Sequence, residues 1–240
     1  MDFKVVIPAH YASTRLPGKV LLKVRGKPII EYVYRNACAS GAGQVLVATD
    51  DSRIVEAVQA FGAEACLTST EHTSGSDRIA EVIQHNAWAE ETVIVNLQAD
   101  EPMMSGDNIA QVAANLGNHP GADIATLCAE LAGEHEARNR DIVKVVYDQD
   151  NIATGFSRDM ETFAKSSGHT VYRHLGIYAY RAGFLCRFTR WPRSRLERKE
   201  SLEQMRAFEH GSPIHVQMCT SPPGIGVDTQ EDYEALLKAM

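Results

Sequence analysis

Short apolar runs alternate with longer segments of helical apolar spacing through the first half of the chain. The runs that predict buried strands are residues 4–9, 44–48, 65–68 and 92–97. The segments between them predict helices over residues 29–39, 51–61, 76–85 and 107–116. This alternation indicates an α/β fold whose sheet is mostly parallel, Rossmann-like and covered by helices on both faces. In such sheets, ligands bind at the edge where the strands end.

The pattern changes after about residue 120. Further strands are predicted over residues 124–127, 143–147, 171–180 and 214–218. The remaining segments predict a polar loop at 159–168, a charged helix at 195–209 and a closing helix at 229–240 with Thr229 as its N-cap. We therefore expect a single domain over residues 1–240, in which about 120–210 form an embedded subdomain that is mixed or antiparallel.

Composition narrows the classes of function. The 240 residues carry a net charge of −7, which argues against a general nucleic-acid or anionic-membrane surface but not against binding one polyphosphate. The five cysteines are odd in number and lack the close spacing of a zinc site, so we expect free thiols in a reducing cytoplasm. The N-terminus does not resemble a signal peptide, and no apolar run approaches the ~18 residues of a membrane span.

The turn after the first strand carries the strongest chemical signal. Arg15 can donate two hydrogen bonds to phosphate oxygens, Lys19 offers a point charge, and Gly18 lets the backbone approach a ligand closely. Neither a Walker loop nor a G-x-G-x-x-G dinucleotide fingerprint is present. An exposed basic loop is the alternative, but the position directly after the first strand favours a triphosphate site.

Two acidic residues lie where a predicted strand and a predicted loop end. Asp100 comes directly after an apolar strand, and Asp228 follows a Pro/Gly loop. Carboxylates at the ligand-binding edge suit Mg²⁺, which favours one or two of them together with phosphate oxygens. Taken alone, Asp100 is better explained as part of an acidic loop that caps the next helix. Asp228 is also explained by an ordinary helix N-terminus, and for this residue both explanations can hold at once.

Two further segments give weaker signals. The stretch from His72 to Arg78 can present backbone N–H groups to an anion where a helix opens. Strand alternation over residues 172–180 places His174 and Tyr178 on one face, where they can bind sugar hydroxyls or a carboxylate. A structural role is the simpler explanation for either segment alone.

Taken together, the motifs resemble the 3-deoxy-manno-octulosonate (Kdo) cytidylyltransferases, also called CMP-Kdo synthetases. The motifs that carry the resemblance, in chain order, are IPAHYASTRLPGK, HTSGSDRIAEV, VNLQADEP, FSR, RHLGIYAYR, LEQ and GIGVDTQED. The resemblance implies a nucleotidyltransferase sheet, a homodimer formed with residues 120–210, and a Mg²⁺-dependent reaction of CTP with Kdo that yields CMP-Kdo and pyrophosphate. It implies no nucleic-acid partner and no membrane insertion.

The resemblance also implies roles for individual residues. The implied catalytic residues are Arg15, Lys19, Asp100 and Asp228, the two aspartates also holding the metal. The implied nucleotide-binding residues are Pro8, Ala9, His10, Ser13, Gly18, Ser74, Gly75 and Arg78. The implied sugar-binding residues are Gln98, Arg158, His174, Tyr178, Glu203 and Gln204.

Three departures from the family pattern leave the acceptor sugar open. His10 stands where the family usually has Arg, Ala99 replaces a usual Gly, and the usual Ile-Pro after Arg158 is missing. We expect Kdo as the acceptor, with a related 2-keto-3-deoxy acid such as an 8-amino variant second. The alternatives are a cytidylyltransferase for a different acidic sugar and a catalytically weakened paralogue that binds nucleotide.

Overall fold

A mixed sheet runs through the molecule, whose computed structural model describes residues 2–159 and 170–240. Nine strands of the described residues join it, in the order β11-β7-β10-β6-β1-β4-β5, with β8 paired to β10 and β9 to β8. These strands are β1 (Lys4–Ala9), β4 (Gln44–Thr49), β5 (Ala65–Leu67), β6 (Val93–Asn96), β7 (Ile124–Ala129), β8 (Lys144–Tyr147), β9 (Ala153–Ser157), β10 (Tyr172–Arg181) and β11 (Ile214–Met218). The predicted α/β sheet is therefore confirmed.

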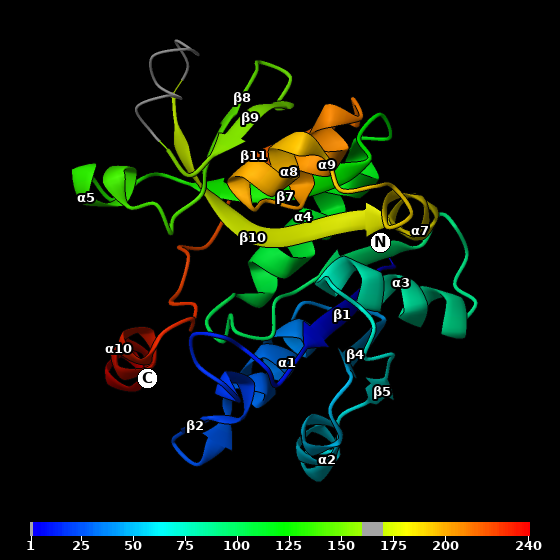
Figure 1. Ribbon diagram of the computed structural model, residues 1–240, viewed down its shortest axis with the longest axis vertical. Coiled ribbons are helices and arrows are strands. Elements are labelled where there is room, and N and C mark those ends of the chain that lie inside the picture. Colours follow the sequence, from blue (N-terminus) through cyan, green and yellow to red (C-terminus); the bar gives the residue numbers. More distant parts are fainter. Residues whose placement is uncertain (1, 160–169) are drawn as a thin grey trace.

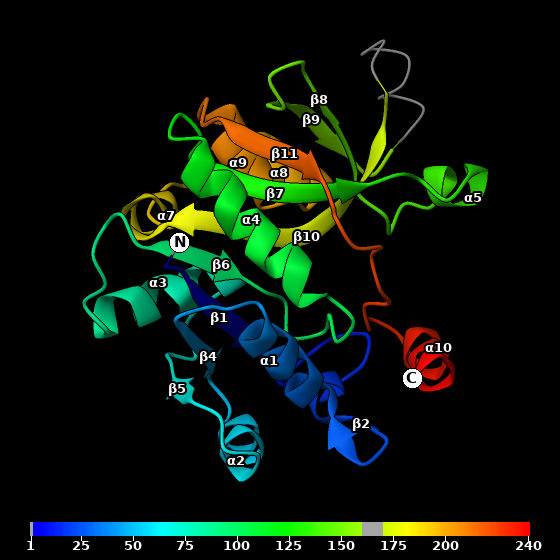
Figure 2. The ribbon, with the colours of Figure 1, turned by 180° about the vertical axis from the view of Figure 1, so that it is seen from behind.

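Helices cover both faces of this sheet (Figures 1 and 2). The helices are α1 (Ile29–Ala39), α2 (Ser52–Ala60), α3 (Gly75–His85), α4 (Gly106–Asn118), α5 (Glu134–Arg138), α7 (Ala182–Phe188), α8 (Arg195–Glu200), α9 (Gln204–Glu209) and α10 (Gln230–Ala239). One apolar cluster joins the sheet to α1, α2 and α4, and a second joins it to α3, α7 and α9. Because both faces are buried, the central strands are apolar on both sides, which is why they appear in the sequence as unbroken apolar runs.

One strand of the central sheet runs against its neighbours. β1 is parallel to β4 and β6, and β11 is parallel to β7, whereas β10 is antiparallel to both β6 and β7. The first residues of β10 consequently lie at the edge where β6 and β7 end. His174 is paired with Cys128 near the end of β7, and Tyr178 is paired with Asn96 at the end of β6. This reversal carries side chains from the second half of the chain to the ligand-binding edge.

The second half departs from prediction in several places. The predicted helix over 195–209 is wrong: it is two short helices separated at Ser201, which adopts a left-handed φ of 54°. The short elements β9, α5 and α7 were not predicted. The helix α5, for example, buries none of its residues and so shows no apolar stripe. Most of the predicted loop at 159–168 lies outside the described residues.

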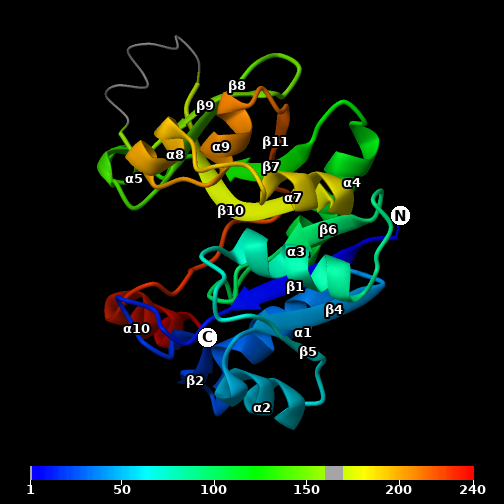
Figure 3. The ribbon, with the colours of Figure 1, turned by 45° about the vertical axis from the view of Figure 1, so that its right-hand side comes forward.

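The closing helix lies beside a small hairpin of the N-terminal half (Figure 3). This hairpin consists of β2 (Lys23–Val24) and β3 (Lys27–Pro28), and the hydroxyl of Tyr233 on α10 donates to the Lys23 carbonyl at 2.7 Å. Thr229 caps α10 as predicted, in a capping box with Asp232. The docking of α10 brings the preceding loop, and Asp228 with it, to the N-terminal turn.

Candidate active site

A tight turn follows β1 and fixes the start of a one-turn 3-10 helix, η1 (Lys19–Leu21). The Tyr11 carbonyl accepts from the Ser13 amide at 2.9 Å and from the Gly18 amide at 2.8 Å. Gly18 has a φ of 70°, and a Cβ there would stand 2.9 Å from the Tyr11 ring. Both the left-handed backbone and the close approach require glycine, so the turn holds Lys19 in one place.

Lys19 joins the two predicted metal-binding aspartates. Its ammonium lies 2.5 Å from Asp100 Oδ2 and 2.7 Å from Asp228 Oδ1, and its side chain is only 7% exposed. Arg15 makes a second ion pair with Asp228, at 2.8 Å. Residues from three distant segments of the sequence therefore meet at one point, as the sequence predicts.

The charges at this point reinforce one another. Burial opposes the charge on Lys19, but Asp100 and the hydrogen bonds to both aspartates outweigh it and raise the pKa of Lys19. Burial likewise opposes ionisation of Asp228, yet Lys19 and Arg15 lower the pKa of that carboxyl. Both groups are therefore charged at neutral pH. Next to them, burial and then the charge of Asp100 raise the pKa of Glu101 to about 8, which leaves this third carboxyl protonated.

Close backbone packing explains why Asp228 reaches Asp100. The Val227 amide donates to the Asp100 carbonyl at 2.8 Å. A Cβ on Gly226 would stand 2.8 Å from the Glu101 carboxyl, and one on Gly224 would stand 2.1 Å from Met103 Cβ. The two glycines thus allow the Pro/Gly loop to lie directly on the loop that follows β6.

The donor set at this point fits Mg²⁺. Within the described residues, no group of three His, Cys, Asp or Glu side chains forms a ready-made metal cluster. Mg²⁺ does not require one, because it commonly uses one or two carboxylates and completes its shell with phosphate oxygens and water. Asp100 and Asp228 both contact a single ammonium group. Two hard oxygen donors therefore converge where a cation is already favoured.

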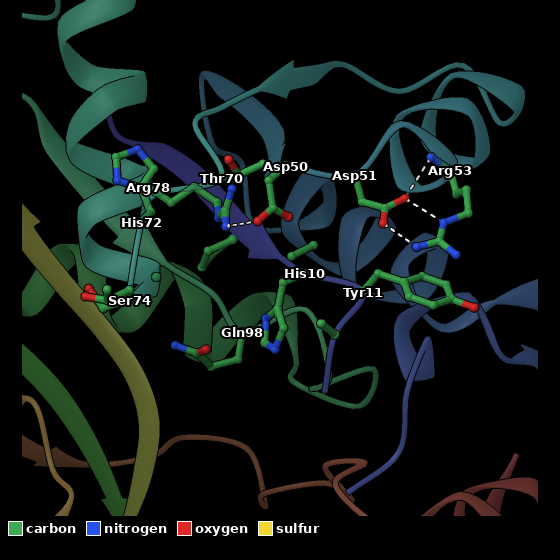
Figure 4. A pocket seen from close by; sticks show the side chains of 15 residues that line it. His10, Tyr11, Asp50, Asp51, Arg53, Thr70, His72, Ser74, Arg78 and Gln98 are labelled. Atoms are coloured by element: carbon green, nitrogen blue, oxygen red, sulfur yellow. Dashed lines mark hydrogen bonds and ion pairs between the residues drawn. The ribbon is translucent and has the colours of Figure 1, made fainter. Parts of the chain in front are cut away.

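A cavity of about 460 Å³ opens between the end of β1 and the start of α3 (Figure 4). Seven residues with predicted roles line it: Pro8, Ala9, His10, Ser74, Gly75, Arg78 and Gln98. Ser74 caps α3, and it lines the cavity together with Gly75, the first residue of that helix. Arg78 is held by Asp50 at 2.8 Å and by the Thr68 hydroxyl. We refer to this space as the first cavity.

A second cavity, of about 560 Å³, opens at Asp100 and Asp228. Arg15, His174, Gly176, Tyr178 and Gln204 line it together with the two aspartates. The amide nitrogen of Gln204 is buried and has no hydrogen-bond partner among the described residues. A buried donor without a partner is costly, so it marks a place where a polar ligand would be stabilised.

His174 faces the second cavity as a neutral ring. Burial lowers its pKa to about 3. Its Nε2 lies 2.9 Å from Thr126 Oγ1, which itself donates to the Ile177 carbonyl at 2.7 Å. Because the Thr126 proton is engaged there, Nε2 carries the proton that Thr126 accepts, and Nδ1 is left as an acceptor. His174 thus offers a hydrogen-bond acceptor for a hydroxyl and no positive charge.

The remaining residues implied to face the sugar lie in different surroundings. Gln98 lines the first cavity. The Arg158 guanidinium donates to the carbonyls of Arg140, Asp141 and Glu200, each at 3.2 Å, and it lines neither cavity. The Glu203 carboxylate accepts from the Ser76 hydroxyl at 2.6 Å and borders a separate hollow. Ala99, which stands where the family usually has Gly, is 5% exposed and packs in the core.

Sequence reasoning missed several residues that shape these cavities. Asp50, which holds Arg78, directly follows β4, so the rule that ligands bind where strands end could have found it. Arg53 and Thr126 gave no signal, and Tyr11 entered only as one letter of the first motif, because the roles of these side chains depend on contacts between elements. Ser13 and Gly18 lie in the turn and line neither cavity.

Comparison with known sequences supports the resemblance. A model of the family described as cytidylyltransferase matches residues 4–214. The chain is 49% identical to a 3-deoxy-manno-octulosonate cytidylyltransferase of Photobacterium profundum, over 98% of this chain and 97% of that protein. It is 48% identical to a protein of the same description from Tolumonas auensis, over 98% and 95%.

Solved structures agree on the fold. A CMP:2-keto-3-deoxy-manno-octonic acid synthetase complexed with CTP superimposes with a TM-score of 0.90 and 38% identity, covering 100% of this chain and 98% of that one. A cytidylyltransferase from Leptospira borgpetersenii, at 17% identity over 98% and 84%, has a TM-score of 0.63 and shows the fold alone. The family match over most of the chain and the full-length identities show that this chain belongs to the cytidylyltransferases, and among them to the 3-deoxy-manno-octulosonate cytidylyltransferase family.

Proposed function

We propose that the protein transfers CMP from CTP to Kdo, with release of pyrophosphate and with Mg²⁺ held by Asp100 and Asp228. The observation that carries the proposal is the contact of Lys19 with both aspartates, which line the second cavity. The relatives are described as enzymes of this activity, and the solved relative contains CTP. These names supply the substrates, and the geometry supplies a site suited to them.

Each cavity suits one substrate. The first has backbone amides at the start of α3 and a fixed Arg78, which suit the cytidine end of CTP. The second has His174 as a hydroxyl acceptor, the phenol of Tyr178 and the unpartnered Gln204 amide, which suit a polyhydroxylated acid. Burial raises the pKa of Tyr178, so its hydroxyl stays protonated and able to donate. The α-phosphorus would lie beside Asp100 and Asp228.

The charged residues around Asp100 and Asp228 would position the reaction and stabilise its charge. Arg15 and Lys19 would hold the triphosphate while a sugar hydroxyl attacks the α-phosphorus and pyrophosphate leaves. Asp100 and Asp228 would hold Mg²⁺, which when bound lowers the pKa of a coordinated hydroxyl and neutralises phosphate charge. Asp228 is suited to this role because Lys19 and Arg15 keep it ionised.

The test is a pyrophosphate-release assay with CTP, Mg²⁺ and Kdo. We expect turnover by the parent protein, and a fall in kcat of at least about 100-fold for Asp100→Asn, because the amide oxygen carries no charge for the metal. Asp107→Asn, at an exposed aspartate of α4, is the matched control and should keep parent activity. Nearly unchanged kcat for Asp100→Asn at saturating Mg²⁺ would contradict the metal role.

Two expectations of the sequence complete the proposal. We infer a homodimer, which light scattering at micromolar concentration would test. We also place the reaction in the cytoplasm, because all five cysteines are free thiols. Within the described residues, no helix is both long and apolar enough to cross a bilayer.

A further inference from the structure

Arg53, the second residue of α2, lies flat against a residue of the N-terminal turn. Its guanidinium carbon is 3.4 Å from the centre of the Tyr11 ring (Figure 4). Asp51 holds the guanidinium in that orientation with two hydrogen bonds, from Nε at 2.9 Å and from Nη2 at 2.6 Å. The hydrogen bonds from Arg53 lower the pKa of Asp51, so the pair stays charged. Arg53 is thus fixed between a carboxylate and an aromatic face.

Tyr11 in turn supports the turn that carries Arg15 and Lys19. Its ring packs against Gly18, close enough that a Cβ there would stand 2.9 Å from ring carbons. Its carbonyl accepts the amides of Ser13 and Gly18. A shift of Tyr11 would therefore move both ends of the turn. A continuous chain of contacts leads from Asp51 through Arg53 and Tyr11 to Gly18, the residue before Lys19.

The other arginine of the first cavity cannot take this role. Arg78 is 6% exposed at its side chain and is committed to Asp50 and Thr68, away from the turn. Arg53 is 56% exposed and reaches the turn from outside. Arg53 lies outside the motifs that carry the family resemblance, and it does not share the partners of Arg78.

We propose that Arg53 is a positioning residue: by stacking on Tyr11 it fixes the turn that presents Arg15 and Lys19 to the triphosphate of CTP. This inference rests on the proposed function, because it assigns the turn to CTP. The guanidinium acts through Tyr11 and need not touch the substrate. We therefore expect Arg53 to affect the binding of CTP and not the second cavity, where Kdo would bind.

Substitutions at Arg53 and Tyr11 test the contact between these two side chains. Arg53→Met keeps the length of the side chain and removes both the charge and the hydrogen bonds to Asp51. A cation–π contact at an exposed site corresponds to about a two- to fivefold effect, so we expect KM for CTP to rise about two- to fivefold, with kcat and KM for Kdo near parent values. Tyr11→Leu should match Arg53→Met, whereas Tyr11→Phe, which keeps the ring, should resemble the parent. Arg53→Lys keeps the positive charge, so its KM for CTP should lie between those of the parent and Arg53→Met.

The double variant and a control test whether the contacts act as one unit. The double variant Arg53→Met/Tyr11→Leu should raise KM for CTP no more than the single variant with the larger effect does, because both substitutions break the same series of contacts. Arg35→Met is the matched control: Arg35 is 58% exposed and paired with Glu31 on α1. It should leave KM for CTP unchanged. Additive effects in the double variant, or an unchanged KM for CTP in an active Arg53→Met enzyme, would overturn the proposal.

A second readout does not depend on the proposed reaction. Limited trypsin digestion without nucleotide, followed by mass spectrometry, reports how often the Arg15–Leu16 bond becomes accessible. Arg53→Met and Tyr11→Leu should speed cleavage at this bond, and Arg35→Met should not. If the two variants are cleaved faster but the parent protein shows no turnover with CTP and Kdo, the proposed function is refuted and the positioning role is supported. If Arg53→Met is cleaved at the parent rate, the positioning role is refuted.

Discussion

A buried histidine outside the candidate active site, His215, should make the stability of this protein sensitive to acid. His215 of β11 is fully buried, and its ring stacks on His119 with centroids 3.8 Å apart. Neither ring nitrogen of His215 has a hydrogen-bond partner among the described residues. Burial, and then the neighbouring His119, lower the pKa of His215 to about 4. The substitution His215→Phe keeps a planar ring in the stack and removes the titrating group.

The sign and size of the effect follow from linkage. An unfolded histidine takes up a proton below about pH 6.5, whereas folded His215 does so only near pH 4. Between these values the unfolded state binds more protons, so the free energy of unfolding falls as pH falls. At pH 5 the loss from this one group is about 1.5 pH units times 1.36 kcal/mol, or about 2 kcal/mol relative to neutral pH.

Urea unfolding at pH 7.5 and pH 5.0 measures this loss. We expect the free energy of unfolding of His215→Phe to fall by about 2 kcal/mol less than that of the parent between the two pH values. At pH 7.5 the variant should be as stable as the parent or more so, because it removes two buried ring nitrogens that lack partners. His85→Phe changes an exposed histidine of α3 and should retain the pH dependence of the parent. If His215→Phe kept that dependence too, the argument from burial would be refuted.

Two further substitutions test the second cavity. Thr126→Val removes the hydroxyl that fixes the His174 tautomer, and we expect KM for Kdo to rise about tenfold with KM for CTP little changed, whereas equal changes in both would contradict a local role. Gly176→Ala adds a methyl group that would meet no heavy atom within 4 Å, so we expect parent-like thermal unfolding but a higher KM for Kdo, and an unchanged KM would show that the sugar does not approach Gly176.

The elements that the sequence predicts well are those whose packing is uniform along their length. β1, β4 and β6 are buried on both faces, so their apolar runs identify them without knowledge of their neighbours. The charged helix predicted over 195–209 was wrong because its break depends on one residue, Ser201, whose left-handed conformation is not favoured by its type. Local composition could not reveal it.

In the candidate site too, some residues could be placed from the sequence and others could not. Lys19, Asp100 and Asp228 could be predicted because each directly follows a strand or loop at the ligand-binding edge. The placement of Arg158 and Glu203 could not, because long side chains choose among partners that only the fold supplies: backbone carbonyls for Arg158 and Ser76 for Glu203. Thr126 escaped notice because its hydroxyl matters only through an irregularity in β10 between Leu175 and Tyr178, which brings His174 within reach.

The ion pairs at the centre of the site set a condition on substrate binding. Lys19 and Arg15 are the cations that a triphosphate needs, yet both are paired with carboxylates. A triphosphate that drew them away alone would leave Asp100 and Asp228 unpaired beside its own negative charge, which is unfavourable in a partly buried site. On the proposed function, a metal ion arriving with the nucleotide would supply the missing positive charge. We therefore expect the pairing of Lys19 with both aspartates to favour CTP with magnesium over CTP alone.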